Sequence, residues 1–211
     1  MPELPEVETV RRALAHGLAG RRIAHVRVRK RALRVPLPKD FEKRLQGRRV
    51  VGVERRAKFL LAYLDSQDVW VAHLGMSGRM RLFRSPAPPT EKHDHVEIET
   101  DDGMVLRFKD PRRFGLMAVV RENDLARHPW FRALGPEPLA AGFDGEALAR
   151  RLAGRKTALK AALMDQRIVA GLGNIYVCKA LFRARLSPFR RAGTVKGPSA
   201  NNLVHAIRAV L

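Results

Sequence analysis

Apolar residues recur at every second position in a series of short segments within residues 23–120, and this pattern constrains the fold most. Such alternation is typical of strands that bury one face and expose the other. Turns containing glycine or proline separate the segments, which indicates a β-sandwich or a β-barrel. The predicted strands are 23–29, 50–53, 59–64, 69–74, 79–83, 95–100, 104–108 and 116–120.

Helical spacing of apolar residues precedes and follows this region. Residues 2–20 read as one helix, because their apolar positions recur three and four apart. The same period returns after Asp144, with predicted helices at 145–154, 157–168, 175–186 and from 201 onward. We therefore expect an α+β chain with an N-terminal helix plus β-sandwich domain (1–135), a linker (136–143) and a helical domain (144–211). The last helix reaches Leu211 inside an apolar stripe with no cap, so we expect the helical domain to be truncated.

The charge of the chain indicates a polyanionic partner. Lys and Arg number 41 against 21 Asp and Glu, giving a formal net charge of +20. A nucleic-acid binder fits this charge, and so does a ribosomal or chromatin-type protein. The bases concentrate in residues 21–60 and 150–196, either as solvated faces or as a phosphate-binding groove. No apolar run approaches the roughly 18–20 residues of a membrane span, and the single Cys178 excludes an internal disulfide or a Cys-rich zinc site within this chain.

The N-terminus offers amine and carboxylate chemistry. Removal of Met1 would leave Pro2 with a free secondary amine, which titrates far lower than a lysine and can attack an electrophilic carbon. Glu3 and Glu6 place two carboxylates within reach of the same substrate, one to donate a proton and one to hold charge. The alternative is a plain helix start, with acids that complement the helix dipole.

Four further motifs combine polar chemistry with turns. In AGLGN (170–174), glycines allow close backbone approach, Asn174 suits a helix N-cap, and the next helix would favour an anion. DPRRFG (110–115) could place Phe114 in a DNA groove, or Phe114 could be core with Asp110 paired to an arginine. HLGMSG (73–78) offers His73 and Met76, residue types that are most often packed. KHDH (92–95) is only a partial metal set, so His93 is interpreted as a phosphate contact and no metal ligand is predicted.

Taken together, these segments resemble the formamidopyrimidine-DNA glycosylases, bifunctional glycosylase/lyases of base excision repair related to endonuclease VIII. The resemblance runs over essentially the whole chain, in the order of that family. The matching motifs are MPELPEVET at the start, RRAKFLL (55–61), HLGMSG, KHDH, DPRRFG, LGPEPL (134–139), RKTALK (155–160) and LMDQRIVAGLGNIY (163–176).

The resemblance implies a fold and a set of roles. It implies a β-sandwich with an N-terminal helix, a helix–two-turn–helix domain, and double-stranded damaged DNA bound between them. Pro2 resembles the Schiff-base nucleophile, Glu3 the general acid for sugar ring opening, and Lys58 the phosphate contact that assists β-elimination. Met76, Arg112 and Phe114 resemble the trio that fills the void left by the flipped base and faces the orphaned base opposite it. Backbone-phosphate contacts are implied for His93, Lys156 and Asn174, and Arg112 is also expected to bind DNA.

The sequence also departs from that family. The family holds one zinc ion in a C-terminal ribbon with four cysteines, which this sequence lacks, so no cofactor is expected here. Lys179 stands where an acid is usual. Oxidised purines such as 8-oxoguanine and formamidopyrimidines are the expected substrates, with strand cleavage by β/δ-elimination. Oxidised pyrimidines, or a non-catalytic damaged-DNA-binding fragment, remain the alternatives. We expect a cytoplasmic monomer that acts on the bacterial chromosome.

Overall fold

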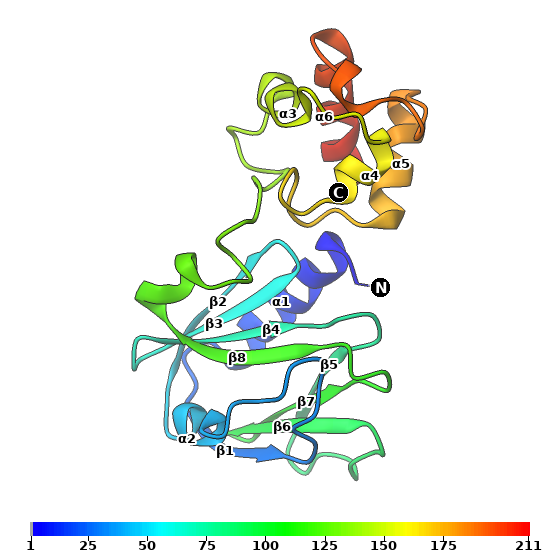
Figure 1. The fold of residues 1–211 in the computed structure, drawn as a ribbon. Helices are drawn as coiled ribbons and strands as arrows, with labels where there is room; N and C mark the ends of the chain where they lie inside the picture. The colour runs from blue at the N-terminus through cyan, green and yellow to red at the C-terminus, as the bar shows by residue number, and fades with distance from the viewer. Residues whose placement is uncertain (1) are drawn as a thin grey trace. The chain divides into compact units, whose positions relative to one another are not determined.

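The computed structural model describes residues 2–211 and divides into two compact units (Figure 1). The first unit comprises Pro2 and Glu6–Arg127, and the second comprises Glu3–Pro5 and His128–Leu211. The chain therefore contributes three N-terminal residues to the unit that is otherwise built from its C-terminal part. Each unit has its own apolar core.

The first unit is a β-sandwich with an N-terminal helix, as predicted. Its two antiparallel four-stranded sheets have the orders β1-β6-β7-β5 and β2-β3-β4-β8 (Figure 1). Its elements are α1 (Leu4–Leu18), β1 (Ile23–Val28), α2 (Phe41–Leu45), β2 (Val50–Arg56), β3 (Phe59–Leu64), β4 (Asp68–His73), β5 (Arg79–Arg84), β6 (Asp94–Thr100), β7 (Met104–Lys109), β8 (Leu116–Arg121) and the 3₁₀ helix η1 (Glu122–Arg127).

The core of the sandwich explains why alternation located its strands. Val26, Val53, Leu60, Ile98 and Leu106 are buried in one cluster, to which the inner faces of strands from both sheets contribute. All eight predicted strands are present, with ends that differ by a few residues at most. Helix α2 was not predicted, because its five residues are too few to show a helical period.

The second unit contains α3 (Gly145–Leu152), α4 (Leu159–Met164), α5 (Asn174–Ala184), η2 (Ala192–Thr194) and α6 (Pro198–Val210). The helix predicted at 157–168 is shorter than expected, because the chain turns at Asp165. The Asp165 carboxylate accepts the backbone N–H of Arg167 at 3.0 Å, a local turn that competes with continued helix. The side chain of Gln166 then accepts from Gly171 N at 2.8 Å and donates to the carbonyl of Leu172 at 2.8 Å. These bonds fold residues 165–173 into the connection between α4 and α5.

The residues predicted as a linker are hydrogen-bonded to the second unit. Pro136 accepts from the backbone N–H of Ala170 at 3.0 Å, and the guanidinium of Arg208 donates to the carbonyls of Ala140 and Phe143 at 3.0 and 2.8 Å. The two units are divided earlier in the chain, between Arg127 and His128. Within the described residues, no helix is both long and apolar enough to cross a membrane.

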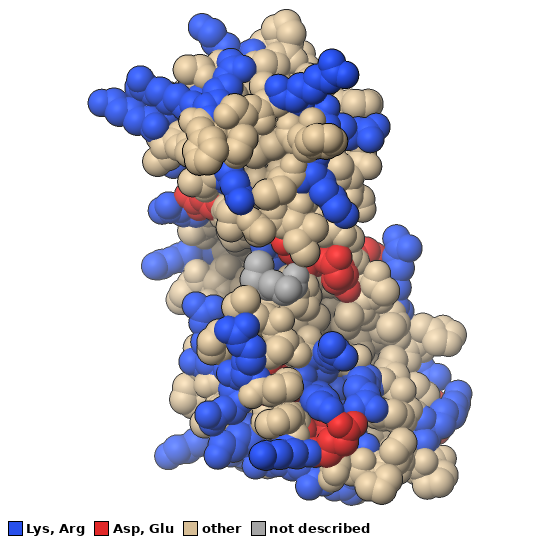
Figure 2. All heavy atoms as spheres, turned by 90° about the vertical axis from the view of Figure 1, so that its right-hand side faces the viewer, with Lys and Arg blue, Asp and Glu red and all other residues tan. Residues whose placement is uncertain are grey.

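Positive charge covers both units on the face drawn in Figure 2, where blue Lys and Arg side chains greatly outnumber red Asp and Glu. This distribution agrees with the two basic runs of the sequence. It gives each unit a surface that attracts polyanions.

Candidate functional site

The carboxylate of Glu3 is buried in the second unit, at the start of α5. Glu3 is 1% exposed, and its two oxygens accept backbone N–H groups from Gly173 at 2.9 Å, Ile175 at 2.8 Å and Tyr176 at 3.2 Å. These are the N–H groups that a helix leaves without partners in its first turn. The helix end therefore fixes the position of a side chain that comes from the other end of the chain.

Two glycines of the AGLGN turn make room for this N-terminal segment. A side chain at Gly173 would place its Cβ 2.5 Å from Cδ of Glu3, a distance that real Cβ atoms essentially never show. Gly171 has a φ of +92°, and its carbonyl accepts the N–H of Leu4 at 3.2 Å. The turn thus requires glycine at both positions, for close approach and for backbone conformation.

The prediction that Asn174 caps α5 is wrong. Gly173 occupies the cap position and makes no side-chain bond, whereas Asn174 is the exposed first residue of the helix. The anion expected at these amides is the carboxylate of Glu3 rather than a phosphate. The hydrogen bond between Glu3 and Gly173 joins positions 170 residues apart, so no pattern within a short segment predicts it.

Met76, Arg112 and Phe114 come together on two adjacent turns of the first unit. Met76 and Phe114 are 44% and 41% exposed, so the interpretation of Phe114 as a core residue is wrong. The guanidinium of Arg112 lies over the ring of Phe114, 4.6 Å from its centre. Asp110 is fully buried, but its carboxylate pairs with Ser77 and Gly115 rather than with an arginine. The three predicted side chains are thus exposed, and the turns that carry them are held by the hydrogen bonds of the buried Asp110 carboxylate.

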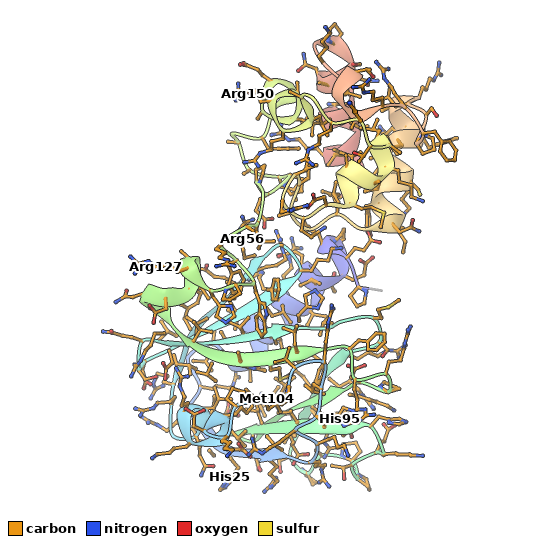
Figure 3. The ribbon with its side chains drawn as sticks, in the orientation of Figure 1. His25, Arg56, His95, Met104, Arg127 and Arg150 are labelled. Carbon is orange, nitrogen blue, oxygen red and sulfur yellow. The ribbon has the colours of Figure 1, made fainter. Side chains whose placement is uncertain are left out.

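The KHDH motif borders these turns. His95, on β6, bonds through Nε2 to the carbonyl of Asp110 at 2.8 Å (Figure 3). His93 is partly buried and helps line a cavity of about 650 Å³, together with the basic residues Arg29, Lys30, Lys92 and Arg113. Glu91 and Asp94 also line this cavity, so its four basic residues outnumber two acids, and this excess of positive charge suits a phosphate group.

Lys58 and His73 lie close together in the first unit. Lys58 is 8% exposed, in the turn between β2 and β3. Burial, reinforced by the charges of Lys58 and Arg34, lowers the pKa of His73 to about 4, so the ring is neutral at pH 7. His73 packs edge-on against Phe59, and its Nδ1 accepts the N–H of Gly75 at 2.9 Å. The interpretation of His73 as a packed residue is confirmed, and its ring also braces the turn that carries Met76.

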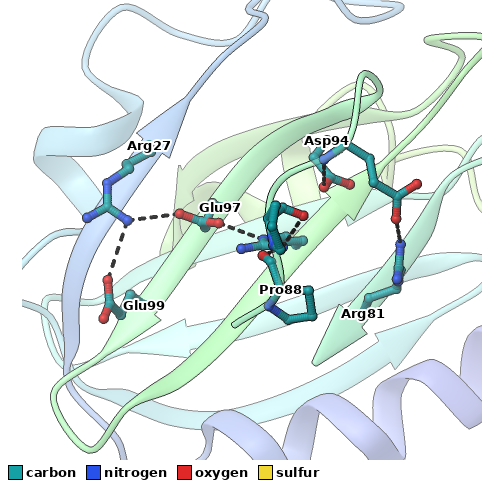
Figure 4. Close-up of polar contacts among 9 residues, drawn as sticks. Arg27, Arg81, Pro88, Asp94, Glu97 and Glu99 are labelled. Carbon is teal, nitrogen blue, oxygen red and sulfur yellow. Dashed lines mark hydrogen bonds and ion pairs between the residues drawn. The ribbon is translucent and has the colours of Figure 1, made fainter. Parts of the chain in front are cut away.

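Some arginines of the basic run 21–60 are already paired within the first unit. On the sheet drawn in Figure 4, Arg27 reaches Glu97 at 2.8 Å and Glu99 at 3.4 Å, while Arg107 reaches Glu97 at 2.6 Å. These arginines are therefore bound to acids of the sheet, and phosphate binding by the rest of the run stays a prediction. Ion-paired arginines of the run include Arg21, Arg27, Arg31, Arg44 and Arg55.

The remaining predicted site residues lie at the surface, apart from the half-buried Pro2. Glu6 is exposed in the first turn of α1, and Lys156 is exposed before α4. Lys179 lies over the ring of Tyr176, with Nζ 5.0 Å from the ring centre, so the base found in place of the usual acid has a cation–π partner.

The described residues do not provide a metal site. No group of three or more His, Cys, Asp or Glu side chains among residues 2–211 is arranged to hold an ion, and the thiol of Cys178 is exposed.

Sequence reasoning missed Ser77, and it did not predict the contacts that Gly173 and Asp110 make. Gly173 supports Glu3, while Ser77 and Asp110 connect the turns of Met76 and Phe114. All three belong to motifs that stand out in the sequence. Their function depends on contacts between motifs, which a pattern of one segment does not reveal.

The two units of this fold match the two domains of one class of proteins, the DNA glycosylases of base excision repair. The formamidopyrimidine-DNA glycosylase N-terminal domain matches residues 1–117, and the H2TH domain of the same enzymes matches residues 134–211. The chain belongs to the formamidopyrimidine-DNA glycosylase family.

Individual relatives agree with this assignment. The chain is 54% identical to the formamidopyrimidine-DNA glycosylase of Afipia carboxidovorans, a match that covers the whole chain and 78% of the relative. It is 53% identical to the formamidopyrimidine-DNA glycosylase of Rhodospirillum centenum, and this match covers the whole chain and 76% of the relative. Among solved structures, the Lactococcus lactis enzyme bound to abasic-site DNA superposes with a TM-score of 0.90 at 32% identity, covering 98% of this chain and 78% of that one. The Thermus thermophilus protein gives a TM-score of 0.86 at 42% identity, covering 99% and 74%.

Proposed function

We propose that this protein excises oxidised purines, such as 8-oxoguanine and formamidopyrimidines, from double-stranded DNA and then cleaves the strand as a lyase. The observation that carries the proposal is the carboxylate of Glu3, fixed by three backbone N–H groups immediately after Pro2. A positioned acid beside a terminal amine is the pair of groups that such a reaction needs. The names of the relatives, which are formamidopyrimidine-DNA glycosylases, support the same substrate class.

The residues divide the chemistry between them. The amine of Pro2 attacks C1′, and the bond from C1′ to the damaged base breaks. Glu3 delivers the proton that O4′ takes up as the sugar ring opens, leaving an iminium between Pro2 and C1′. Loss of a C2′ proton then expels the 3′ phosphate by β-elimination, which Lys58 assists by holding phosphate, and δ-elimination follows. Glu6 is assigned to the substrate pocket.

Binding is assigned to groups of both units. His93, Arg112, Lys156 and Asn174 contact DNA, chiefly through its backbone phosphates. Met76, Arg112 and Phe114 occupy the space that the flipped nucleotide leaves. Their exposure on adjacent turns supports this role, because a buried residue could not enter a duplex.

Lesion choice tests the substrate class. Duplexes carrying 8-oxoguanine opposite cytosine, or thymine glycol opposite adenine, are each incubated with enzyme in excess, and single-turnover rates are compared. We expect faster excision of 8-oxoguanine. Faster excision of thymine glycol would assign the protein to oxidised pyrimidines, and binding without excision of either would make it a damaged-DNA-binding protein.

Replacing Lys156 with alanine should weaken binding to damaged and undamaged DNA alike. Each neutralised phosphate contributes about 0.9 to the slope of log affinity against log salt, so the slope should fall by about one. Binding is measured by fluorescence anisotropy from low to moderate salt. Lys43→Ala, which removes an exposed lysine on α2, is the matched control. A loss confined to damaged DNA would contradict a phosphate contact.

Replacing Phe114 with alanine should slow excision from a duplex by roughly 10- to 100-fold, since unstacking a base costs a few kcal/mol that the wedge offsets. Cleavage at a preformed abasic site should change much less. The melting temperature should hardly move, because the side chain is 41% exposed and a buried phenylalanine would lose about 3–5 kcal/mol on the same change. A large drop in melting temperature, with equal loss of both activities, would show that Phe114 serves packing.

A further inference from the structure

Two turns of the first unit, one carrying Met76 and the other carrying Arg112 and Phe114, are in backbone contact. The contact is so close that the first turn requires a glycine at position 75. Gly75, which has a φ of +64°, lies against the backbone of the other turn, and a Cβ there would overlap the Phe114 carbonyl and come within 2.6 Å of Gly115 N. Met76 follows Gly75 on the first turn, and Arg112 precedes Phe114 by two residues on the second. The side chains assigned to the void therefore project from one contact between backbones.

Asp110 holds the second turn from inside. Its side chain is fully buried, and Oδ2 accepts the N–H of Gly115 at 2.8 Å. Its carbonyl accepts from Arg113 N at 3.2 Å and bonds to the ring of His95 at 2.8 Å. A buried carboxylate is costly unless hydrogen bonds satisfy it, so these partners fix the turn around it.

Ser77 connects the two turns through a single hydroxyl. Its Oγ donates to Oδ1 of Asp110 at 2.5 Å and accepts the backbone N–H of Arg112 at 3.2 Å. One serine hydroxyl thus binds the buried support of the second turn and the backbone of the residue that carries the guanidinium. Ser77 itself is the neighbour of Met76 on the first turn.

We infer that Ser77 is a positioning residue that locks the Met76 turn to the Arg112–Phe114 turn, so that the three side chains enter DNA as one rigid wedge and Arg112 reads the base opposite the lesion. The inference rests on the proposed void-filling role of these three residues. Without the hydroxyl, Arg112 keeps its charge and its ring contact, but its backbone loses the bond that fixes it relative to Met76. Discrimination among opposite bases then suffers more than overall DNA affinity.

The test uses binding, which does not depend on chemistry. Duplexes carrying a stable tetrahydrofuran abasic analogue opposite cytosine, adenine, guanine or thymine are titrated by fluorescence anisotropy with the wild type, Ser77→Ala and Ser77→Thr. In Ser77→Ala, we expect the ratio of dissociation constants between the worst and best opposite base to fall by up to about tenfold, within the range that one base contact supplies. Ser77→Thr keeps the hydroxyl and should restore the ratio. Ser187→Ala, a serine replacement in the second unit, should leave it unchanged.

A double-mutant cycle separates positioning from general loss of structure. If Ser77 acts through Arg112, Ser77→Ala should not lower the ratio any further in protein that already carries Arg112→Ala. Melting temperatures of all variants are measured, and titrations are run well below the lowest. An additive effect in the double variant, or an unchanged ratio in Ser77→Ala, would overturn the inference.

The same variants distinguish the void-filling role of Met76, Arg112 and Phe114 from the positioning role of Ser77. If Arg112→Ala changes the ratio and Ser77→Ala does not, the void-filling role stands and the positioning role of Ser77 falls. If Met76→Ala, Arg112→Ala and Phe114→Ala all leave both the ratio and excision from a duplex unchanged, the proposed function of the trio falls, and the role of Ser77 falls with it.

Discussion

Protein that retains Met1 is expected to form no borohydride-trapped adduct with abasic-site DNA, whereas protein that begins at Pro2 should be trapped readily. Reduction captures an iminium at residue 2 only when the nitrogen of that residue is a free amine, and in the form that retains Met1 this nitrogen is part of an amide bond. With a pKa near 7.7–8.0 against about 10.4 for lysine, a terminal amine is unprotonated at pH 7 some hundreds of times more often. The two forms are distinguished by intact mass, and the adducts are counted on a denaturing gel.

Two variants complete this experiment. Pro2→Gly also leaves a free terminal amine once Met1 is removed, so it should still be trapped, whereas Lys58→Ala tests the internal amine directly. Equal trapping of the forms with and without Met1 would move the nucleophile elsewhere, with Lys58 as the next candidate. Loss of trapping in Lys58→Ala together with retention in the Met1 form would establish that lysine.

Glu3→Gln should reduce base excision by about 10²- to 10⁴-fold, the range of a lost general acid, and leave part of the cleavage at preformed abasic sites. The structure adds a second reason for a large effect. Both oxygens of the carboxylate accept N–H groups, so an amide at this position must turn an NH₂ group toward a donor. Single-turnover excision of 8-oxoguanine and cleavage of an abasic duplex are measured on the same preparation.

Gly173→Ala provides an independent change with the carboxylate retained. Its Cβ would approach Cδ of Glu3 to 2.5 Å and displace the acid from its amides, so excision should fall while abasic-site binding persists. Thermal unfolding shows whether either variant has lost its fold. If Glu3→Gln excised bases at the wild-type rate, or lost both activities in parallel, the role of general acid would be wrong.

Local patterns were sufficient for the sandwich. Segments such as 59–64 and 104–108 place alternate residues in the common core, and residues on their other face are buried as well. Helix α2 was not predicted because its two buried residues, Phe41 and Leu45, lie only one turn apart, and this spacing also fits other local structures. Asp165 shows a third case, in which a side-chain turn ends a helix whose apolar spacing continues.

The sequence predicted which residue types belong to the site, but it did not predict which of these residues are hydrogen-bonded to one another. Pro2, Glu3 and the AGLGN glycines all stood out in the sequence, yet their connection depends on a bond between Glu3 and Gly173. Likewise Phe114 could be read as core or as exposed, because a single aromatic residue on a turn carries no period. Such choices are made by tertiary contacts, which a short segment does not encode.

The burial of Glu3 has a consequence for the gene. A start codon placed a few triplets upstream would add residues in front of a side chain that is 1% exposed and already hydrogen-bonded on both oxygens. Both apolar cores could still form in such a protein, since neither contains a residue before Val7. It would nevertheless lack a proline at its first position. Under the proposed mechanism, the position of the start codon and the removal of the initiator methionine therefore decide activity without changing the packing of the sandwich.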